Sequence, residues 1–529
     1  MPTDCISYQN SGFFTPIIND YLNQDPELKP LYNRFPTLEN FEEQILEKQR
    51  SYNFKHRQVL VSVLQEQCSH IQMSELTRQN ISALATANTF TVTTGHQLNL
   101  FTGPLYFLYK IISTVNLTKE LKAKYPQFNF VPVYWMATED HDFEEINYFN
   151  FKGKKFRWNK EVKGAVGRLS TGGLEEVLEV FGLELGTSIS ANALKKLFHE
   201  AYIQHINLAD ATRFLANALF SEYGLIIIDA DDAVLKREFV PHIKTELLSQ
   251  TSHKLVLETI QKLKKYGIQV NPREINLFYL ENNLRERIVF EQGMFKVNNT
   301  KIHFSETEIL RELDNYPEKF SPNVIMRPLY QEVILPNLCY IGGGGELSYW
   351  LELKAYFDSE KVTFPILLLR NSVLLATEKQ ARKADKLNLS WKDLFLKQDD
   401  LLALKVKGFS EFPIDLEIQK EHLRNQFHYL HLIAERTDKS FSGAVKAQEV
   451  KQINGLDHLE KRLLKAEKRK HAEKLQRVTD LQNDLFPNHG LQERKVNFSE
   501  FYRDFGVPLI ERLVNELKPL NNQIAVLVL

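Results

Sequence analysis

The stretch TFTVTTGHQLNLFTGPLYFLYKIIS, residues 89–113, shows how this chain begins its fold. Its first six residues alternate large apolar side chains with threonine, which predicts a β-strand over residues 89–94. The loop GHQLNLFTG follows, and Pro104 opens a predicted helix, because its missing N–H would be unpaired in a first helical turn anyway. Apolar residues then recur at the spacing of one helical face. The stretch is therefore predicted to form a strand, a loop and a helix.

A second predicted strand, FVPVYWMA at residues 130–137, is almost continuously apolar, as a strand buried on both faces should be. It runs into the loop TEDHDFEEIN. A helix that connects two strands of one sheet in this way implies that the strands are parallel. Both loops then leave carboxyl ends of parallel strands and lie at the edge where open α/β folds bind ligands.

Two later segments fit the same core. YGLIIIDADD at residues 223–232 and FPILLLRN at residues 364–371 predict buried strands that end in polar loops. Between them, residues 245–310 predict a small α/β module with a strand, INLFYL, and a hairpin that turns near Gln292 and Gly293. We therefore predict an α/β fold with a parallel-sheet core and insertions.

From about residue 381 the chain is charged and helical. Leucines recur at intervals of seven residues, at Leu416, Leu423 and Leu430, and charged residues flank them, which is typical of a coiled coil. A loop near Ser440–Gly443 predicts two antiparallel helices, and Pro487 is expected to end the second. The domain prediction, in chain order, is core 1–150, connecting module 151–200, core 201–244, connecting module 245–310, core 311–380, helical coiled-coil arm 381–486 and a segment 487–529 that packs back on the body.

Composition excludes several classes of protein. A net charge of −1 and a pI near 7.0 disfavour a globally basic nucleic-acid binder. No run approaches the roughly 18 apolar residues of a membrane-spanning helix, and the first residues do not resemble a secretory signal, so we expect a cytoplasmic protein without membrane partners. The three cysteines are scattered, so we expect neither a zinc cluster nor a disulfide framework.

The first candidate site is the loop with Gly95, His96, Asn99 and Gly103. Glycines let backbone N–H groups approach an anion, and a helix that begins at Pro104 would direct its positive end to the same place. His96 and Asn99 could donate to phosphate oxygens. The alternative is a plain loop with a helix cap, since neither a P-loop ending nor a GxGxxG fingerprint is present.

The second candidate site is Glu139-Asp140-His141-Asp142 with Glu144 and Glu145, and Asn147 follows it. Crowded carboxylates raise one another's pKa values, and a histidine between them is expected to stay protonated to higher pH. Binding of an amine, binding of Mg²⁺ and acid–base catalysis are all open to such a cluster. The alternative is a helix N-terminus whose acids complement the helix dipole.

The third candidate site is the glycine run that includes Gly343 and Gly344, followed by Glu346 and Tyr349. Glycines let the backbone approach a ligand closely, and a helical pattern follows them. Arg327, upstream, is a candidate partner for a phosphate or a carboxylate. A flexible linker is the alternative.

Five blocks together resemble the BshC family of bacillithiol biosynthesis. They are TTGHQLNLFTGPLYFLYKIIS (93–113), VYWMATEDHDFEEIN (133–147), YGLIIIDADD (223–232), SPNVIMRPLYQEVILP (321–336) and GGGGELSYWLEL (342–353). The resemblance implies a Rossmann-like core similar to class I aminoacyl-tRNA synthetases and pantoate ligases, two connecting modules and a dimerising coiled coil. It also implies a ligase that joins the cysteine carboxylate to the amine of glucosaminyl-malate in an amide bond.

A carboxylate does not acylate an amine unaided, so ATP or another adenine nucleotide is expected to activate it, and Mg²⁺ would be compatible with this. The residue assignments are catalytic Asp140, His141, Asp142 and Glu346; cofactor-binding Gly95, His96, Asn99, Gly103, Gly343 and Gly344; and substrate-binding Glu139, Asn147, Arg327, Tyr349 and Asn371.

The chain departs from the synthetases in two ways: GHQ stands where they carry HIGH, and no KMSKS loop is found. The alternatives are another adenylate-forming ligase or nucleotidyltransferase with a different acceptor, a coiled-coil scaffold with a degenerate enzyme core, and a metal-dependent hydrolase that uses the EDHD cluster.

Overall fold

The structure is a computed structural model that describes residues 4–529. The chain forms two compact units. The first contains the residues up to Leu374 together with Leu491–Ala525, and the second contains Leu375–Gly490 and Val526–Leu529. No helix in the described part of the chain is both long and apolar enough to cross a membrane.

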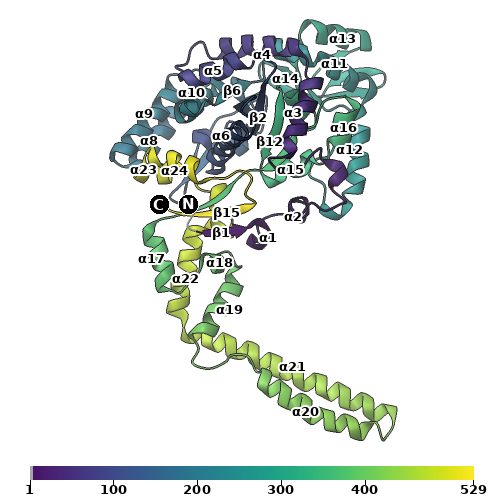
Figure 1. The fold of residues 1–529 in the computed structure, drawn as a ribbon, viewed down its shortest axis with the longest axis vertical. Helices are drawn as coiled ribbons and strands as arrows, with labels where there is room; N and C mark the ends of the chain where they lie inside the picture. Colours follow the sequence, from purple (N-terminus) through teal and green to yellow (C-terminus); the bar gives the residue numbers. More distant parts are fainter. Residues whose placement is uncertain (1–3) are drawn as a thin grey trace. The chain divides into compact units, whose positions relative to one another are not determined.

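A five-stranded parallel sheet forms the centre of the first unit (Figure 1). Its strands are β2 (Thr89–His96), β3 (Asn129–Met136), β6 (Ile226–Asp229), β12 (Asn337–Gly342) and β13 (Ile366–Leu369), in the order β13-β12-β2-β3-β6. Numbered along the chain, this order is 3-2-1-4-5 from one edge, the Rossmann order, and the direction of winding reverses between β2 and β12. The predicted α/β fold with a Rossmann-like core is therefore confirmed.

The core of this unit forms where helices cover the sheet. Side chains of α3 (Asn40–Ser51) and α6 (Tyr106–Lys124) join those of β2, β12 and β13 in one apolar cluster. Each predicted strand is present, but β12 was not predicted as a strand. Its six residues follow the apolar helix α14 (Met326–Ile334) with only two residues between, and periodicity alone does not separate so short a buried strand from its helix.

Helix α6 begins at Tyr106, two residues later than the predicted start at Pro104. Pro104 instead forms a β-bridge with Asn497, and the N–H of Leu105 donates to the Val496 carbonyl at 2.9 Å. The late segment Leu491–Ala525 thus packs on the core, and the Asn116 side chain of α6 also donates to the carbonyls of Val514 and Leu517.

The predicted hairpin in the second module is confirmed. Strands β8 (Leu284–Glu291) and β9 (Met294–Val297) pair antiparallel, and Gln292 and Gly293 both have positive φ in the two-residue turn. The five-stranded sheet has the order β10-β9-β8-β7-β11, with β7 (Leu277–Glu281), β10 (His303–Phe304) and β11 (Phe320–Pro322). Because β11 lies beyond residue 310, this sheet includes residues outside the predicted module.

The residues of the first predicted module begin with a two-stranded ribbon of β4 (Tyr148–Phe151) and β5 (Lys154–Arg157) and continue into α8 (Leu174–Leu185) and α9 (Ile189–Ile203). The exact limits of both modules remain predictions.

The second unit is helical. Its helices are α17 (Glu378–Lys386), α18 (Trp391–Leu394), α19 (Gln398–Phe409), α20 (Glu417–Ala434), α21 (Lys439–Lys470) and α22 (Ala472–Leu485). The antiparallel pair is formed by α20 and α21, but the predicted loop near Ser440–Gly443 is wrong, because both residues lie inside α21. The turn comes earlier, because the Asp438 side chain caps α21 by accepting from the N–H of Phe441 at 2.9 Å.

The seam between α20 and α21 differs from the predicted leucine repeat. Phe427, Ala434 and Val445 are buried there, with Leu423 packed against them, whereas Leu430 is 40% exposed. The apolar C-terminal strand β15 (Gln523–Val528) has two partners, since it is the middle strand of the sheet β1-β15-β14, with β1 (Asp4–Ser7) and β14 (Ser372–Ala376).

Candidate active site

A cavity of about 1160 Å³ lies at the carboxyl ends of β2, β3 and β12, beside the point where the strand order reverses. Open α/β sheets bind their ligands at this place. The loops predicted as sites one and two both line it. They also touch, because the Gln97 side chain donates to Asp140 Oδ2 and to Glu145 Oε2, each at 2.9 Å. The predicted convergence of the two loops in one pocket is confirmed.

Most of the predicted site residues line this cavity. From the first two loops they are Gly95, His96, Asn99, Glu139, Asp140, His141 and Asp142. From the later segments they are Arg327, Gly343, Gly344, Glu346 and Tyr349. Gly103, Asn147 and Asn371 are not among the lining residues. The roles assigned to individual residues remain predictions.

Those three residues support the structure around the cavity. Gly103 has φ +61°, and a Cβ there would lie 2.6 Å from the Cβ of Asn99, so only glycine fits. The Asn147 carbonyl accepts from the N–H of Trp158 at 2.7 Å. Asn371 accepts from the Ser113 hydroxyl at 2.9 Å and donates to the Lys518 carbonyl at 2.8 Å. Both the oxygen and the nitrogen of its side-chain amide are therefore hydrogen-bonded within the protein.

The first loop is held in an unusual conformation. Phe101 and Thr102 have positive φ, which is uncommon for residues other than glycine. The Phe101 ring stacks on Phe198 with centroids 4.2 Å apart, and its N–H donates to the Tyr202 hydroxyl at 3.0 Å. Aromatic packing against α9 thus stabilises a strained turn beside the cavity.

This loop offers acceptors to a ligand where donors were predicted. Burial lowers the pKa of His96 well below its usual value, and nearby Lys110 lowers it further, so the ring is neutral. A hydrogen bond between the ring and the Thr102 backbone raises the pKa, as expected when the ring N–H donates to a carbonyl. Among the described residues, Nε2 of this ring has no partner. Asn99 donates its amide to the Glu145 carbonyl at 3.3 Å and leaves Oδ1 unpaired. A bound hydroxyl or ammonium group would satisfy both atoms.

The acidic loop is tied to neighbouring elements. Glu139 is paired with the buried Lys236 of α11 (Ala233–Ser249) at 2.5 Å, and burial raises the pKa of this carboxyl group even so. The guanidinium of Arg285, on β8, donates to His141 Nδ1 at 2.6 Å. Since arginine can only donate, Nδ1 of His141 is the acceptor in this contact.

An ion pair in the lining of the cavity joins α6 to the glycine run. Lys110 of α6 lies 2.5 Å from Glu346 and donates to the Gly95 carbonyl at 2.6 Å. Glu346, on α15 (Gly344–Trp350), also accepts from the Gly343 N–H and the Tyr340 hydroxyl. Burial alone would raise the pKa of Glu346, but Lys110 and these donors hold it below its usual value.

Three residues of this cavity were missed in the sequence. Lys110 is a charged side chain within the apolar run of α6, a signal that it is paired inside the protein. Arg370 ends the apolar segment FPILLLRN, where the next residue, Asn371, was chosen instead. Arg285 had no local signal, because only the tertiary structure brings β8 to the acidic loop.

No group of three or more histidine, cysteine, aspartate or glutamate side chains within residues 4–529 is arranged to hold a metal ion. The carboxylates of the acidic loop are instead engaged with Gln97, Lys236 and Arg157.

Comparison with known proteins agrees with this architecture. Residues 1–371 match the model of the bacillithiol biosynthesis BshC N-terminal Rossmann-like domain, and residues 373–529 match the BshC C-terminal coiled-coil domain. The chain is 68% identical to a protein of Flavobacterium johnsoniae, with 98% of each chain covered, and 58% identical to one of Christiangramia forsetii, with 100% of this chain and 99% of the relative covered.

A more distant relative, from Bacillus cytotoxicus, is 31% identical over 94% of this chain and 95% of its own. All three relatives carry the name "putative cysteine ligase BshC". With both domain models matched end to end and identity this high, the chain belongs to the BshC family, a family of ligases in bacillithiol biosynthesis.

Proposed function

We propose that this protein joins the carboxylate of cysteine to the amine of glucosaminyl-malate in an amide bond, after a nucleotide has activated the carboxylate. The observation that carries the proposal is one cavity at the reversal point of the sheet that carboxylates and cations line together. We call the part lined by Asp140, Asp142 and Glu145 its acidic end and the part lined by Lys110, Arg327 and Arg370 its basic end. Such a cavity suits a reaction between an amine and a group that carries negative charge.

The acidic end is suited to the amine. The unpaired acceptors His96 Nε2 and Asn99 Oδ1 suit a donor such as this amine, and Asp140 lines the same cavity. A nearby carboxylate could accept a proton from this amine as the new bond forms, and Asp140 is our choice for that role. Glu346 is held by Lys110, Gly343 and Tyr340, so we assign it to positioning the glycine run.

The basic end is suited to the activated carboxylate and the nucleotide. Activation by ATP would leave negative charge on phosphate, and preorganised cations stabilise the charge that develops during acyl transfer. Gly343 and Gly344 line this end, and little side-chain volume stands between their backbone and a ligand. An adenine nucleotide is the proposed cofactor, and Mg²⁺ would be held mainly by its phosphates, as is usual for this ion.

The test is direct. Purified protein is incubated with cysteine, glucosaminyl-malate, ATP and Mg²⁺, and the thiol product is measured by mass spectrometry. The release of AMP or of ADP then distinguishes an adenylate from an acyl-phosphate. We expect Asp140→Asn to lower product formation at least about 100-fold, as loss of a general base does. The exposed Glu306→Gln on α13 (Glu306–Asn315) is the control. Absence of product from the wild-type protein with every nucleotide would refute the proposal.

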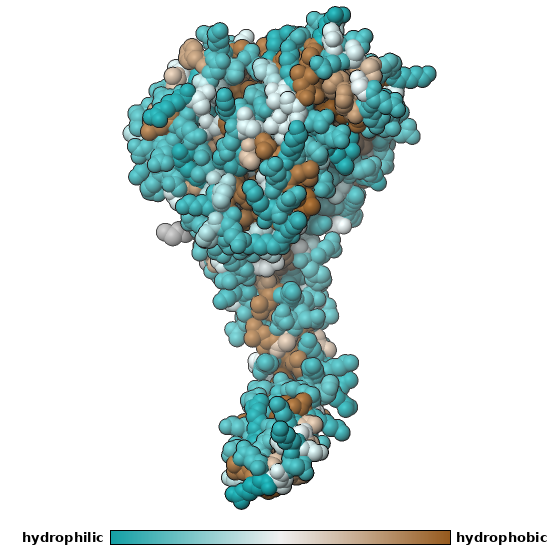
Figure 2. Space-filling model, turned by 90° about the vertical axis from the view of Figure 1, so that its right-hand side faces the viewer, coloured by the Kyte–Doolittle hydropathy of each residue, from teal (hydrophilic) through white to brown (hydrophobic). Residues whose placement is uncertain are grey.

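We also propose that the protein is a homodimer through its helical arm. Apolar side chains on α20 and α21 remain exposed, among them Tyr429 at 69%, Ile433 at 55% and Val450 at 51%. Hydrophobic patches also interrupt the polar surface of these helices in the space-filling view (Figure 2). Light scattering after gel filtration should give twice the chain mass. The double variant Tyr429→Ser/Ile433→Ser should be monomeric, and Val180→Ser on α8 should not change the mass.

A further inference from the structure

Two guanidinium groups at the basic end of the cavity each keep one N–H without a partner. The atoms are Nη2 of Arg327, on α14, and Nε of Arg370, directly after β13. Both atoms are shielded from solvent and have no hydrogen-bond partner of their own within residues 4–529, although the Tyr349 hydroxyl lies beside the Arg327 guanidinium. A buried charged donor without an acceptor is unfavourable by more than a typical neutral hydrogen bond contributes. The two groups therefore call for an acceptor that comes from outside the chain.

Arg370 is fixed in place from behind. Its Nη2 pairs with Glu493 at 2.7 Å, and its Nη1 donates to the Asn371 carbonyl at 2.9 Å. Glu493 is itself held, because it accepts from the Ser372 hydroxyl and the Val373 N–H at 3.0 Å each. Arg370 is only 4% exposed. The remaining donor, Nε, lies 3.8 Å from where a Cβ on Gly343 would be, next to the backbone of the glycine run.

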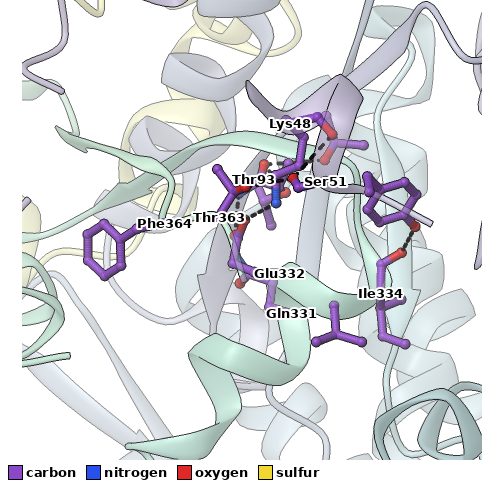
Figure 3. A network of polar contacts seen from close by, with 12 residues as sticks. Lys48, Ser51, Thr93, Gln331, Glu332, Ile334, Thr363 and Phe364 are labelled. Atoms are coloured by element: carbon purple, nitrogen blue, oxygen red, sulfur yellow. Dashed lines mark hydrogen bonds and ion pairs between the residues drawn. The ribbon is translucent and has the colours of Figure 1, made fainter. Parts of the chain in front are cut away.

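Arg327 is fixed through a buried polar network, part of which is drawn in Figure 3. Its Nη1 donates to Gln331 Oε1 at 3.1 Å. The amide of Gln331 in turn donates to Glu332 Oε1 at 3.0 Å, and Glu332 pairs with Lys48 of α3 at 3.1 Å. Gln331, Glu332 and Lys48 are at most 1% exposed, so this chain of contacts is rigid. It orients one side of the Arg327 guanidinium, and the Tyr349 hydroxyl lies beside the same group.

The charges around these two groups do not cancel. Glu346 is paired with Lys110 and also attracts Arg327, and Glu493 is paired with Arg370, so three cations share two carboxylates. Arg494, exposed at the same cavity, adds a further positive charge. The glycine run leaves room for a ligand, since nothing lies within 4 Å of a Cβ placed on Gly345.

We infer that Arg327 and Arg370 form a subsite for one anionic group, a carboxylate or a phosphate, which accepts hydrogen bonds from Arg327 Nη2 and Arg370 Nε. Planar guanidinium groups recognise both kinds of anion. The choice between two sources rests on the proposed function: the malyl carboxylates of the acceptor sugar, or a phosphate of the nucleotide. The subsite itself rests on two unpaired donors whose side chains line one cavity.

The experiment measures binding without any reaction. Isothermal titration calorimetry is performed on the full chain with malate and, separately, with ATP. The variants are Arg327→Met, which removes one guanidinium, and Arg370→Lys, which keeps a positive charge beside Glu493 but loses the Nε donor. Arg311→Met, at an exposed position on α13 away from the cavity, is the matched control. Thermal melting of each variant tests whether it is folded. If Arg370→Lys is not folded, the binding measured for Arg327→Met tests the inference.

We expect each variant to weaken one probe by about tenfold to a hundredfold, the range for hydrogen bonds to charged groups. Weaker malate binding with unchanged ATP binding identifies a carboxylate subsite, and the reverse identifies a phosphate subsite. The inference is overturned if neither variant affects either probe, if the control weakens them equally, or if the wild-type protein binds neither probe below about 10 mM. Because no product is measured, failure of the proposed ligase reaction would leave this result unaffected.

Discussion

The two ends of the cavity place charge in different ways. At the basic end, Arg370 and Glu493 are 5% and 1% exposed, and buried hydrogen bonds surround them. At the acidic end, Glu144 and Arg157 form an ion pair in which the side chains are 76% and 43% exposed. Water screens an exposed pair, whereas a buried pair leaves an uncompensated charge when one partner is removed. The Arg370–Glu493 pair should therefore be sensitive to mutation, and the Glu144–Arg157 pair should tolerate it.

The largest expected effect is on Glu493. Glu493→Ala leaves the Arg370 guanidinium buried without its counter-ion, so we expect the free energy of unfolding to fall by about 3–5 kcal/mol. Urea denaturation followed by circular dichroism measures this change. Glu75→Ala, which removes an exposed ion pair with Arg78, is the control and should change stability by less than about 1 kcal/mol. Equal effects of the two variants would show that burial does not separate the two kinds of pair.

The second prediction concerns Glu352, a buried carboxyl group whose pKa no neighbouring cation within residues 4–529 lowers. Burial raises the pKa of Glu352 to about 7, even though it accepts from the backbone of Gln269 and Val270. Because the pKa is higher in the folded than in the unfolded state, the wild-type protein loses stability as pH rises from about 4.5 to about 7. Glu352→Gln removes this loss and should be more stable than the wild type at pH 8 by about 1–3 kcal/mol.

Urea denaturation of both proteins at pH 4.5 and pH 8 measures the difference. At pH 4.5 the two should be nearly equally stable, because the wild-type carboxyl group is then largely protonated in the folded protein. A gap between them that does not depend on pH would mean that Glu352 is not the titrating group. Lys110 and other donors hold the pKa of Glu346 below its usual value. Comparing Glu352 with Glu346 therefore shows how a nearby cation changes the pKa of a buried carboxyl group.

The third prediction concerns Arg285 at the acidic end. This side chain donates to His141 and stacks over Phe278 at 4.0 Å, so Arg285→Met should release the imidazole. We expect kcat/KM for product formation to fall about tenfold, the effect of a misplaced active-site group. Arg311→Met, at an exposed position on α13 outside the cavity lining, serves as the control. ¹⁵N NMR of the His141 ring should show protonation at Nε2 in the wild type, and a change in that signal only in Arg285→Met.

The smallest effect is expected for Glu144→Gln. The ion pair with Arg157 is exposed, so its removal should alter the free energy of unfolding by at most about 0.5–1 kcal/mol. The difference should shrink further in 1 M salt, because screening weakens exposed charges. A loss comparable to that in Glu493→Ala would remove the distinction between the two ends of the cavity.

Local sequence patterns were sufficient to predict the parts of this cavity that directly follow a recognisable strand. The alternation at residues 89–94 and the apolar run at 130–137 predicted β2 and β3, and the loops after them were therefore placed at one edge of the sheet. Asn371 was chosen in place of Arg370 because both follow β13, and no local pattern tells which of two neighbours faces a cavity. The direction of hydrogen bonding was equally hidden: His96 and Asn99 resembled donors in the sequence, but their donors are used within the protein.

The sequence by itself determined the α/β class, the helical arm and the identity of the loops that meet at the cavity, because periodicity and buried strands are local properties of the chain. Only the tertiary structure decided which charges remain free. Arg327 is oriented by Lys48 through two intermediate residues, and Arg370 by Glu493, which lies more than a hundred residues further along the chain. Ion pairing in a low-dielectric interior depends on distance in space, and separation along the sequence carries no information about it.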